Sequence, residues 1–132
     1  MTQPRTISID LCSSVPAYRQ IVDAMRVQLV EARLKPGQML PTVRRLAMEL
    51  GIHFNTVAQA YRELAEEGWL ELKHGRGALV ISRETPKQKA SPASSSLFGE
   101  RLRQLVAQMR AEGVDALRIA SELKSLAQVL ER

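Results

Sequence analysis

The stretch from Leu40 to Gly77 constrains the fold of this chain more than any other part of the sequence. It contains two short segments in which apolar residues recur every three or four positions, the spacing of one buried helical face. A Gly-Ile pair separates the segments, and two apolar runs around a glycine-rich, basic turn follow them. Two short helices, a tight turn and a hairpin in this order predict a winged helix-turn-helix. We therefore expect a mostly α fold with a small β-hairpin wing.

The first helix of this motif is expected to begin near Thr42 and to end before Gly51. Thr42 follows Pro41, which ends the preceding extended segment, and threonine is a suitable N-cap residue. Gly51 stands where a left-handed residue commonly closes a helix. The predicted buried face comprises Val43, Leu46, Ala47 and Leu50.

The second helix is expected to begin at His53 or Phe54. Its predicted buried face comprises Val57, Ala60, Tyr61 and Leu64. The residues that this leaves outside are Asn55, Thr56, Ala58, Gln59 and Arg62. Asparagine, threonine and glutamine can hydrogen-bond to base edges in a major groove, and in this motif the start of the second helix contacts the bases. The pattern predicts double-stranded DNA as the partner.

The wing is expected after Gly68, with strands over residues 69–72 and 78–81 and a turn over 73–77. Lys73 and Arg76 in the turn would neutralise phosphates, and its glycines would allow a close backbone approach. Taken alone, such a hairpin fits a plain solvated turn equally well. Its position directly after a helix-turn-helix favours DNA.

Residues from about Val15 to Arg83 resemble the DNA-binding domain of the GntR family of bacterial transcriptional regulators. The resemblance is carried by Pro16, Tyr18, Gln20 and Ile21, by LKPGQMLPTVRRLA and by GIHFNTVAQAYRELAEEGWLELKHGRGALV. It implies a winged helix-turn-helix, a homodimer and a palindromic operator. By position, it implies DNA contacts from Arg44, Asn55, Thr56, His74 and Gly75.

The sequence departs from the family pattern at several motif positions. Phe54 and Ala58 stand where many members carry arginine, which shifts the expected base contacts to Arg44 and to the polar residues of the second helix. Arg45 replaces a glutamate that closes a capping box with the residue at Thr42, so Arg45 is open to either phosphate or solvent. The full expected DNA-binding set is Thr42, Arg44, Arg45, Asn55, Thr56, Gln59, Lys73, His74, Gly75 and Arg76.

Composition agrees with this interpretation but does not establish it. The chain has 132 residues, a net charge of +5 and a pI of about 9.9, which suits a nucleic-acid partner. Cys12 is the only cysteine, which excludes an internal disulfide and a cysteine zinc cluster. The start of the sequence lacks a long apolar run, so we expect no signal peptide or membrane span and a cytoplasmic protein.

The sequence offers little for an enzyme. It lacks a P-loop, a glycine fingerprint after a strand and a serine elbow. His53 and His74 lie far apart in the sequence, so we expect neither a metal site nor a cofactor. We interpret the glutamates at 63, 66 and 67 as the solvated end of the second helix rather than as an acid–base pair.

Four segments are expected along the chain. Residues 1–14 form an N-terminal arm with a short strand over Thr6–Asp10, and residues 15–83 form the DNA-binding domain, whose first helix runs from Pro16 to about Arg33. Residues 84–96 are rich in Ser, Pro and Lys and are expected to be a linker. Residues 97–132 are expected to form a helical dimerisation domain.

The last segment predicts two helices joined by a tight turn at residues 112–114. Such a helical hairpin buries too little apolar area to stand alone. We favour a second chain as the cover of its apolar stripe, so that two recognition helices are presented together, over a fold-back onto the chain's own DNA-binding domain. The short tail resembles the YtrA-type subfamily.

The expected function is a homodimeric, sequence-specific regulator of transcription, with repression favoured. A small unidentified effector is compatible with this. Two alternatives remain open at this point: a small-molecule sensor whose ligand is bound by the C-terminal helices, and a protein-interaction adaptor that has lost DNA.

Overall fold

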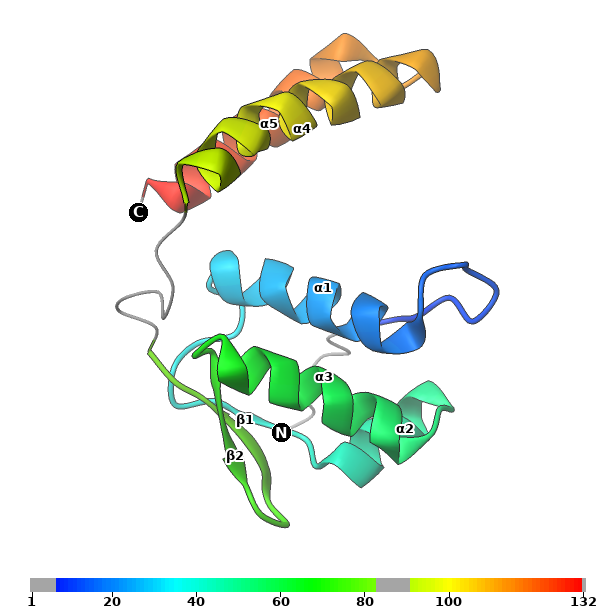
Figure 1. Ribbon diagram of the computed structural model, residues 1–132, viewed down its shortest axis with the longest axis vertical. Helices are drawn as coiled ribbons and strands as arrows, with labels where there is room; N and C mark the ends of the chain where they lie inside the picture. Colours follow the sequence, from blue (N-terminus) through cyan, green and yellow to red (C-terminus); the bar gives the residue numbers. More distant parts are fainter. Residues whose placement is uncertain (1–6, 83–90, 132) are drawn as a thin grey trace. The chain divides into compact units, whose positions relative to one another are not determined.

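The computed structural model describes residues 7–82 and 91–131, and the chain divides into two compact units, Met1–Lys87 and Gln88–Arg132 (Figure 1). Within the described residues, the first unit contains three helices and three strands, and the second contains two helices. The elements are α1 (Ala17–Val30), β1 (Met39–Leu40), α2 (Val43–Leu50), α3 (Phe54–Glu66), β2 (Leu70–Lys73), β3 (Gly77–Val80), α4 (Pro92–Ala111) and α5 (Ala116–Leu130).

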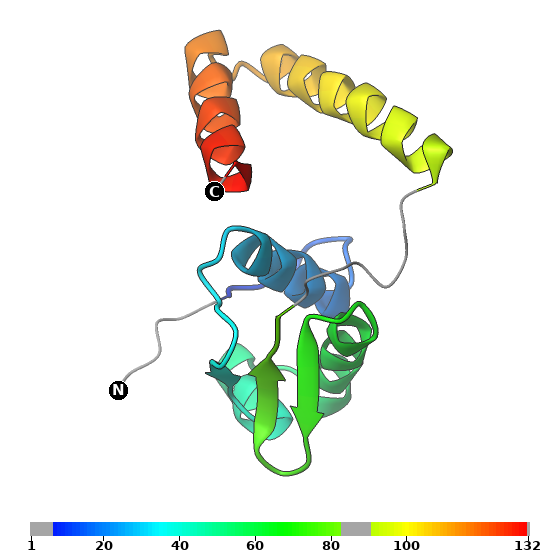
Figure 2. The ribbon, with the colours of Figure 1, turned by 90° about the vertical axis from the view of Figure 1, so that its left-hand side faces the viewer.

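The strands of the first unit form an antiparallel sheet in the order β1-β3-β2. The hairpin of β2 and β3 is the predicted wing, with Lys73 opposite Gly77 at its tip. The short strand β1 adds to the other edge of β3, where Met39 pairs with Leu79 and Leu40 with Ala78. In Figures 1 and 2 the hairpin projects beyond the helices of its own unit. The predicted fold class, mostly α with a small β wing, is confirmed.

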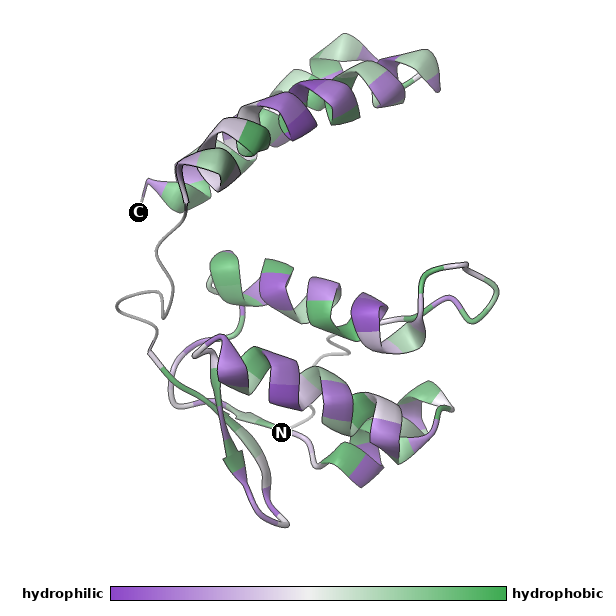
Figure 3. Cartoon of the chain, in the orientation of Figure 1, coloured by the Kyte–Doolittle hydropathy of each residue, from purple (hydrophilic) through white to green (hydrophobic). Residues whose placement is uncertain are grey.

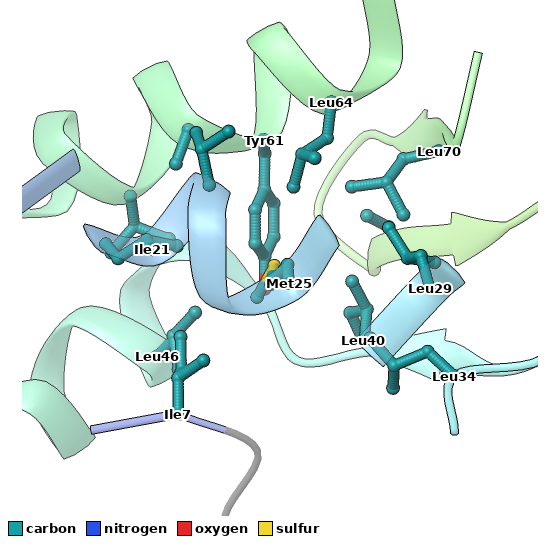
Figure 4. Packing of buried hydrophobic residues seen from close by; sticks show 14 of the residues in the cluster. Ile7, Ile21, Met25, Leu29, Leu34, Leu40, Leu46, Tyr61, Leu64 and Leu70 are labelled. Atoms are coloured by element: carbon teal, nitrogen blue, oxygen red, sulfur yellow. The ribbon is translucent and has the colours of Figure 1, made fainter. Parts of the chain in front are cut away.

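One apolar core holds the first unit together, and Tyr61 of α3 lies within it among side chains from α1, α2 and the sheet (Figure 4). Its hydroxyl donates a hydrogen bond to the carbonyl oxygen of Pro41, 2.8 Å away, so the buried phenol is satisfied. Burial raises the pKa of Tyr61, which therefore stays neutral. The buried faces predicted for the motif helices are in the core for Leu46, Ala47, Val57, Ala60, Tyr61 and Leu64.

The first helix is shorter than predicted. It ends at Val30 rather than near Arg33, and Ala32 adopts a left-handed conformation with φ of +59°. The amides of Arg33 and Leu34 both donate to the carbonyl oxygen of Gln28, which closes the helix end. The spacing of Ala32 continues the helical stripe, which is why the sequence predicts a longer helix. The turn instead directs Leu34, only 3% exposed, into the core.

The strand predicted over Thr6–Asp10 is wrong for its described part, since residues 7–10 form no strand. The edge of β3 that such a strand could use is taken by β1. The alternating pattern is explained by packing instead: Ile7 is buried and Ile9 packs against the core. The segment is held by Gln20, whose side chain accepts from the Asp10 amide and donates to the Asp10 carbonyl oxygen.

The second unit begins earlier than expected. Helix α4 starts at Pro92, so residues 92–96, expected to belong to the linker, are helical. Ser91 is the N-cap and its hydroxyl accepts from the Ser94 amide, 3.0 Å away, while Pro92 suits the first helical turn. Serine and proline favour loops by composition, but both are also favoured at helix starts, and here the second role applies. Residues 83–90 lie outside the described residues.

Helices α4 and α5 are joined by the predicted turn, in which Gly113 has φ of +96°. The amide of Val114 donates to the Met109 carbonyl oxygen, which closes α4. The two helices diverge from this turn (Figure 2), and neither contains a buried residue. Hydrophobic and hydrophilic positions are interspersed along both (Figure 3). Among the described residues no helix is long and apolar enough to cross a membrane.

Candidate nucleic-acid interface

The start of α2 is capped as predicted. The Thr42 hydroxyl accepts a hydrogen bond from the Arg45 amide at 3.2 Å, although the reciprocal half of a capping box is missing because position 45 is arginine. Gly51 closes the helix in the left-handed conformation with φ of +70°. These caps fix where α2 begins and ends, and therefore where the chain turns into α3.

His53 and Phe54 form the start of α3, where their side chains take roles that the sequence pattern does not predict. His53 is the N-cap, because its Nδ1 accepts from the Asn55 amide at 3.1 Å. Its ring stacks on the Phe54 ring with 4.7 Å between centroids. The guanidinium carbon of Arg44 lies over the same phenyl ring, 5.3 Å from its centroid, within the range of a cation–π contact. The starts of α2 and α3 are therefore in direct contact through side chains.

The polar residues predicted to read bases lie along the first turns of α3. Asn55 and Gln59 are exposed and Thr56 is half-buried, while Val57 between them is fully buried. The helical period alone produces this division, since Val57 and its apolar partners face the core. The arrangement leaves two amides and one hydroxyl available for hydrogen bonds with a partner.

The basic residues of the candidate interface differ in their electrostatic partners. Arg45 forms an ion pair with Glu49 at 3.2 Å, and Lys73 forms one with Glu71 at 2.9 Å. Within residues 7–82 and 91–131, Arg44 and Arg76 make no ion pair. The uncompensated charges are thus at the start of α2 and at the wing turn. The other wing residues in the predicted set, His74 and Gly75, are exposed.

The two glycines of the wing turn serve different purposes. Both have positive φ, +72° at Gly75 and +95° at Gly77. A Cβ atom at Gly75 would meet nothing within 4 Å, whereas one at Gly77 would lie 2.2 Å from the Leu40 carbonyl oxygen. The sequence indicates glycines for a sharp turn, but the close contact with β1 at Gly77 depends on strand pairing that local patterns do not reveal.

Two of the glutamates interpreted as the solvated end of α3 instead bind α1, and that interpretation is corrected. Arg19 pairs with Glu63 at 3.3 Å, and Arg26 makes a two-pronged contact with Glu67 whose Nε–Oε1 distance is 2.9 Å. Hydrogen bonding to Glu67 raises the pKa of Arg26. The arginines of α1 and the glutamates near the end of α3 have opposite charges, and this pattern in the sequence could have predicted the ion pairs. These pairs fix the support helix α1 against the C-terminal half of α3.

The Arg26–Glu67 pair is expected to stabilise the first unit by about 1 kcal/mol, since both side chains are partly buried and the contact is two-pronged. A double-mutant cycle of Arg26→Ala and Glu67→Ala, followed by urea denaturation, measures this coupling. The exposed pair Arg45–Glu49 is the matched control, for which we expect less than about 0.5 kcal/mol. Equal coupling in the two pairs would contradict the assigned role of Arg26.

Across the described residues no group of three or more His, Cys, Asp or Glu side chains could hold a metal ion.

Comparison with known proteins identifies the family. The family model described as bacterial regulatory proteins, gntR family, matches residues 17–80. The repressor YtrA of Bacillus subtilis is 34% identical over 120 residues, which cover 91% of each chain. The chain belongs to the GntR family. Its relatives are transcriptional regulators and not enzymes, so the chain is a GntR-family transcriptional regulator.

Two further GntR proteins show how the resemblance is distributed. MngR of Escherichia coli, a repressor of a mannosyl-D-glycerate transport and metabolism system, is 46% identical over 49% of this chain but only 27% of its own length. The structure of YtrA from Sulfolobus acidocaldarius, a GntR-family transcription factor, aligns with a TM-score of 0.54 and 32% identity, covering 80% of this chain and 98% of that one. The YtrA-type resemblance of the short tail is therefore confirmed.

Proposed function

We propose that this GntR regulator is a repressor that binds a palindromic operator as a homodimer, with α3 as the recognition helix. The observation that carries the proposal is the row of hydrogen-bonding side chains on α3, Asn55, Thr56 and Gln59. It is joined by two arginines without an ion pair among the described residues, Arg44 and Arg76. Repression is supported by the names of YtrA and MngR, both described as repressors. The regulator would bind this operator in the cytoplasm.

The roles within the proposed interface follow from chemistry. Asparagine and glutamine amides present a donor and an acceptor together, which suits adenine in the major groove. Arg44, together with Thr42 and Arg45 at the start of α2, would contact the phosphates beside the groove. In the wing, Lys73, His74, Gly75 and Arg76 would lie against the backbone and the minor groove, where positive charge releases counterions.

We assign dimerisation to the second unit. Its two helices contain no buried residue, yet α5 carries Leu123, Leu126 and Leu130 on one face, with exposed fractions of 40%, 45% and 64%. A stripe of this kind needs a cover, and a second copy of the same stripe supplies one. A dimer would present two copies of α3 to half-sites about one helical turn apart.

The variant Asn55→Ala/Thr56→Ala tests the recognition helix. We expect it to lower the preference for operator over random duplex by about 1–3 kcal/mol for each base that the variant no longer contacts, because contacts with base edges carry the sequence information. Competition binding with a duplex enriched from a random pool measures this preference.

Arg76→Ala is the matched comparison for this test. We expect it to weaken binding to all duplexes about equally and to reduce the salt slope by about 1, since it removes a phosphate contact. If Asn55→Ala/Thr56→Ala behaved like Arg76→Ala, with operator preference unchanged, α3 would not be the recognition helix.

A further inference from the structure

Phe54 is an unexpected residue at the first position of α3. The outward residues Asn55, Thr56 and Gln59 of this helix are polar, yet Phe54 is 42% exposed. It follows the N-cap residue and precedes Asn55, so it occupies the part of a recognition helix that lies nearest to the bases in this motif. An exposed aromatic side chain at this position calls for a partner of apolar chemistry.

The ring is held in place by its neighbours. His53 stacks on it at 4.7 Å with 24° between the ring planes, and the Arg44 guanidinium lies over it at 5.3 Å. Both contacts are made to faces of the ring, so its edge is the part best placed to meet another molecule. A side chain with only two rotatable bonds that is already packed in this way gives up little conformational freedom on binding.

Major-groove chemistry limits what the ring edge can recognise. Base edges there present hydrogen-bond donors and acceptors, and the one apolar group among them is the C5-methyl of thymine. Phenylalanine cannot donate or accept a hydrogen bond, so placing it against any other base edge would desolvate a polar group without replacing its bond. A methyl group is the partner that avoids this cost.

We propose that Phe54 is a specificity-determining residue that contacts the C5-methyl group of one thymine in each operator half-site. The inference rests on the proposed recognition role of α3. The contact with the ring keeps Arg44 beside Phe54, where its guanidinium would reach a phosphate next to the base pair that Phe54 contacts. The half-site accordingly requires thymine at the position that Phe54 contacts.

Replacing thymine with uracil, one position at a time in both half-sites of a duplex enriched from a random pool, tests the inference, since uracil lacks only the methyl group. The wild-type chain should lose about fourfold in affinity per half-site at one symmetry-related position, the factor for one methyl group at about 0.8 kcal/mol. Phe54→Ala should bind the thymine and uracil duplexes equally at that position. Phe54→Arg should shift the preference there toward guanine, which arginine contacts through O6 and N7.

Val27→Ala on α1 is the control, because Val27 is another large apolar side chain of similar exposure, 49%, outside the proposed interface. It should retain the full uracil effect. A duplex whose thymines all tolerate uracil, or a Phe54→Ala variant that keeps the wild-type preference for the thymine duplex over the uracil duplex, would overturn the inference and leave the proposed function standing. A pool that yields no enriched duplex would overturn both.

Discussion

Replacing Gly77 with alanine is expected to destabilise the first unit by about 3 kcal/mol or more. The left-handed φ of +95° disfavours any side chain by roughly 1–2 kcal/mol. The new Cβ would also lie 2.2 Å from the backbone oxygen of Leu40. Because that oxygen belongs to β1, which pairs with β3, it cannot move without opening the strand pair. The two costs add.

Thermal unfolding of the full chain, followed by circular dichroism, measures this change. For a unit of this size about 3 kcal/mol corresponds to a fall in Tm of roughly 12–24 °C. Gly75→Ala, two residues away, is the matched control, because Gly75 also has positive φ but open space around it. It should cost only about 1–2 kcal/mol. Equal destabilisation by the two variants would show that the close approach of Gly77 to β1 does not matter.

Replacing Leu123 with aspartate is expected to convert the protein from a dimer to a monomer and to weaken operator binding by about a hundredfold or more. Leu123 shares one apolar face of α5 with Leu126 and Leu130, and it is the least exposed of the three. A carboxylate there would be buried without a partner in the proposed dimer. Once the two DNA-binding domains separate, the second half-site is no longer bound at high effective concentration.

Light scattering for mass and gel shifts for affinity measure the two parts of this prediction. Ser125→Asp is the matched control, because it adds the same charge two residues along, away from the apolar face of α5. It should leave both mass and affinity unchanged. A Leu123→Asp chain that remains dimeric would mean that another surface joins the chains. A wild-type monomer that binds its operator tightly would mean that the stripe serves a different purpose.

Much of the fold was predictable because its determinants are local. The three-and-four spacing of Val57, Ala60, Tyr61 and Leu64 specifies one face of a helix regardless of what covers it, and all four are buried. Thr42 and Gly51 mark the ends of α2 through their own hydrogen bonds and backbone conformation. The wing followed from apolar runs on both sides of a glycine-rich turn.

The features that were missed depend on contacts between distant residues or on competing local preferences. The pairing of β1 with β3 and the Arg26–Glu67 contact join segments far apart in the chain. Ala32 continues the helical spacing of apolar residues, but it adopts a left-handed conformation and α1 ends before Ala32. The turn that follows places Leu34 in the core. Pro92 suits both a linker and a helix start.

The candidate site divides in the same way. The outward position of Asn55 and Gln59 followed from helical period, since the opposite face had to be buried. The cluster of Arg44, His53 and Phe54 did not, because it joins the starts of two helices through side-chain packing. Which of these residues touch DNA is a property of the complex, and the assignment of each remains a prediction.

Selection of bound sequences from a random duplex pool, followed by affinity measurements at two salt concentrations, tests the central claim most directly. We predict an enriched, two-fold symmetric site whose half-sites are about one helical turn apart, bound with a Kd of roughly 10⁻⁸ M or below at physiological salt. No enrichment, with weak binding that disappears as salt rises, would contradict a sequence-specific dimeric regulator.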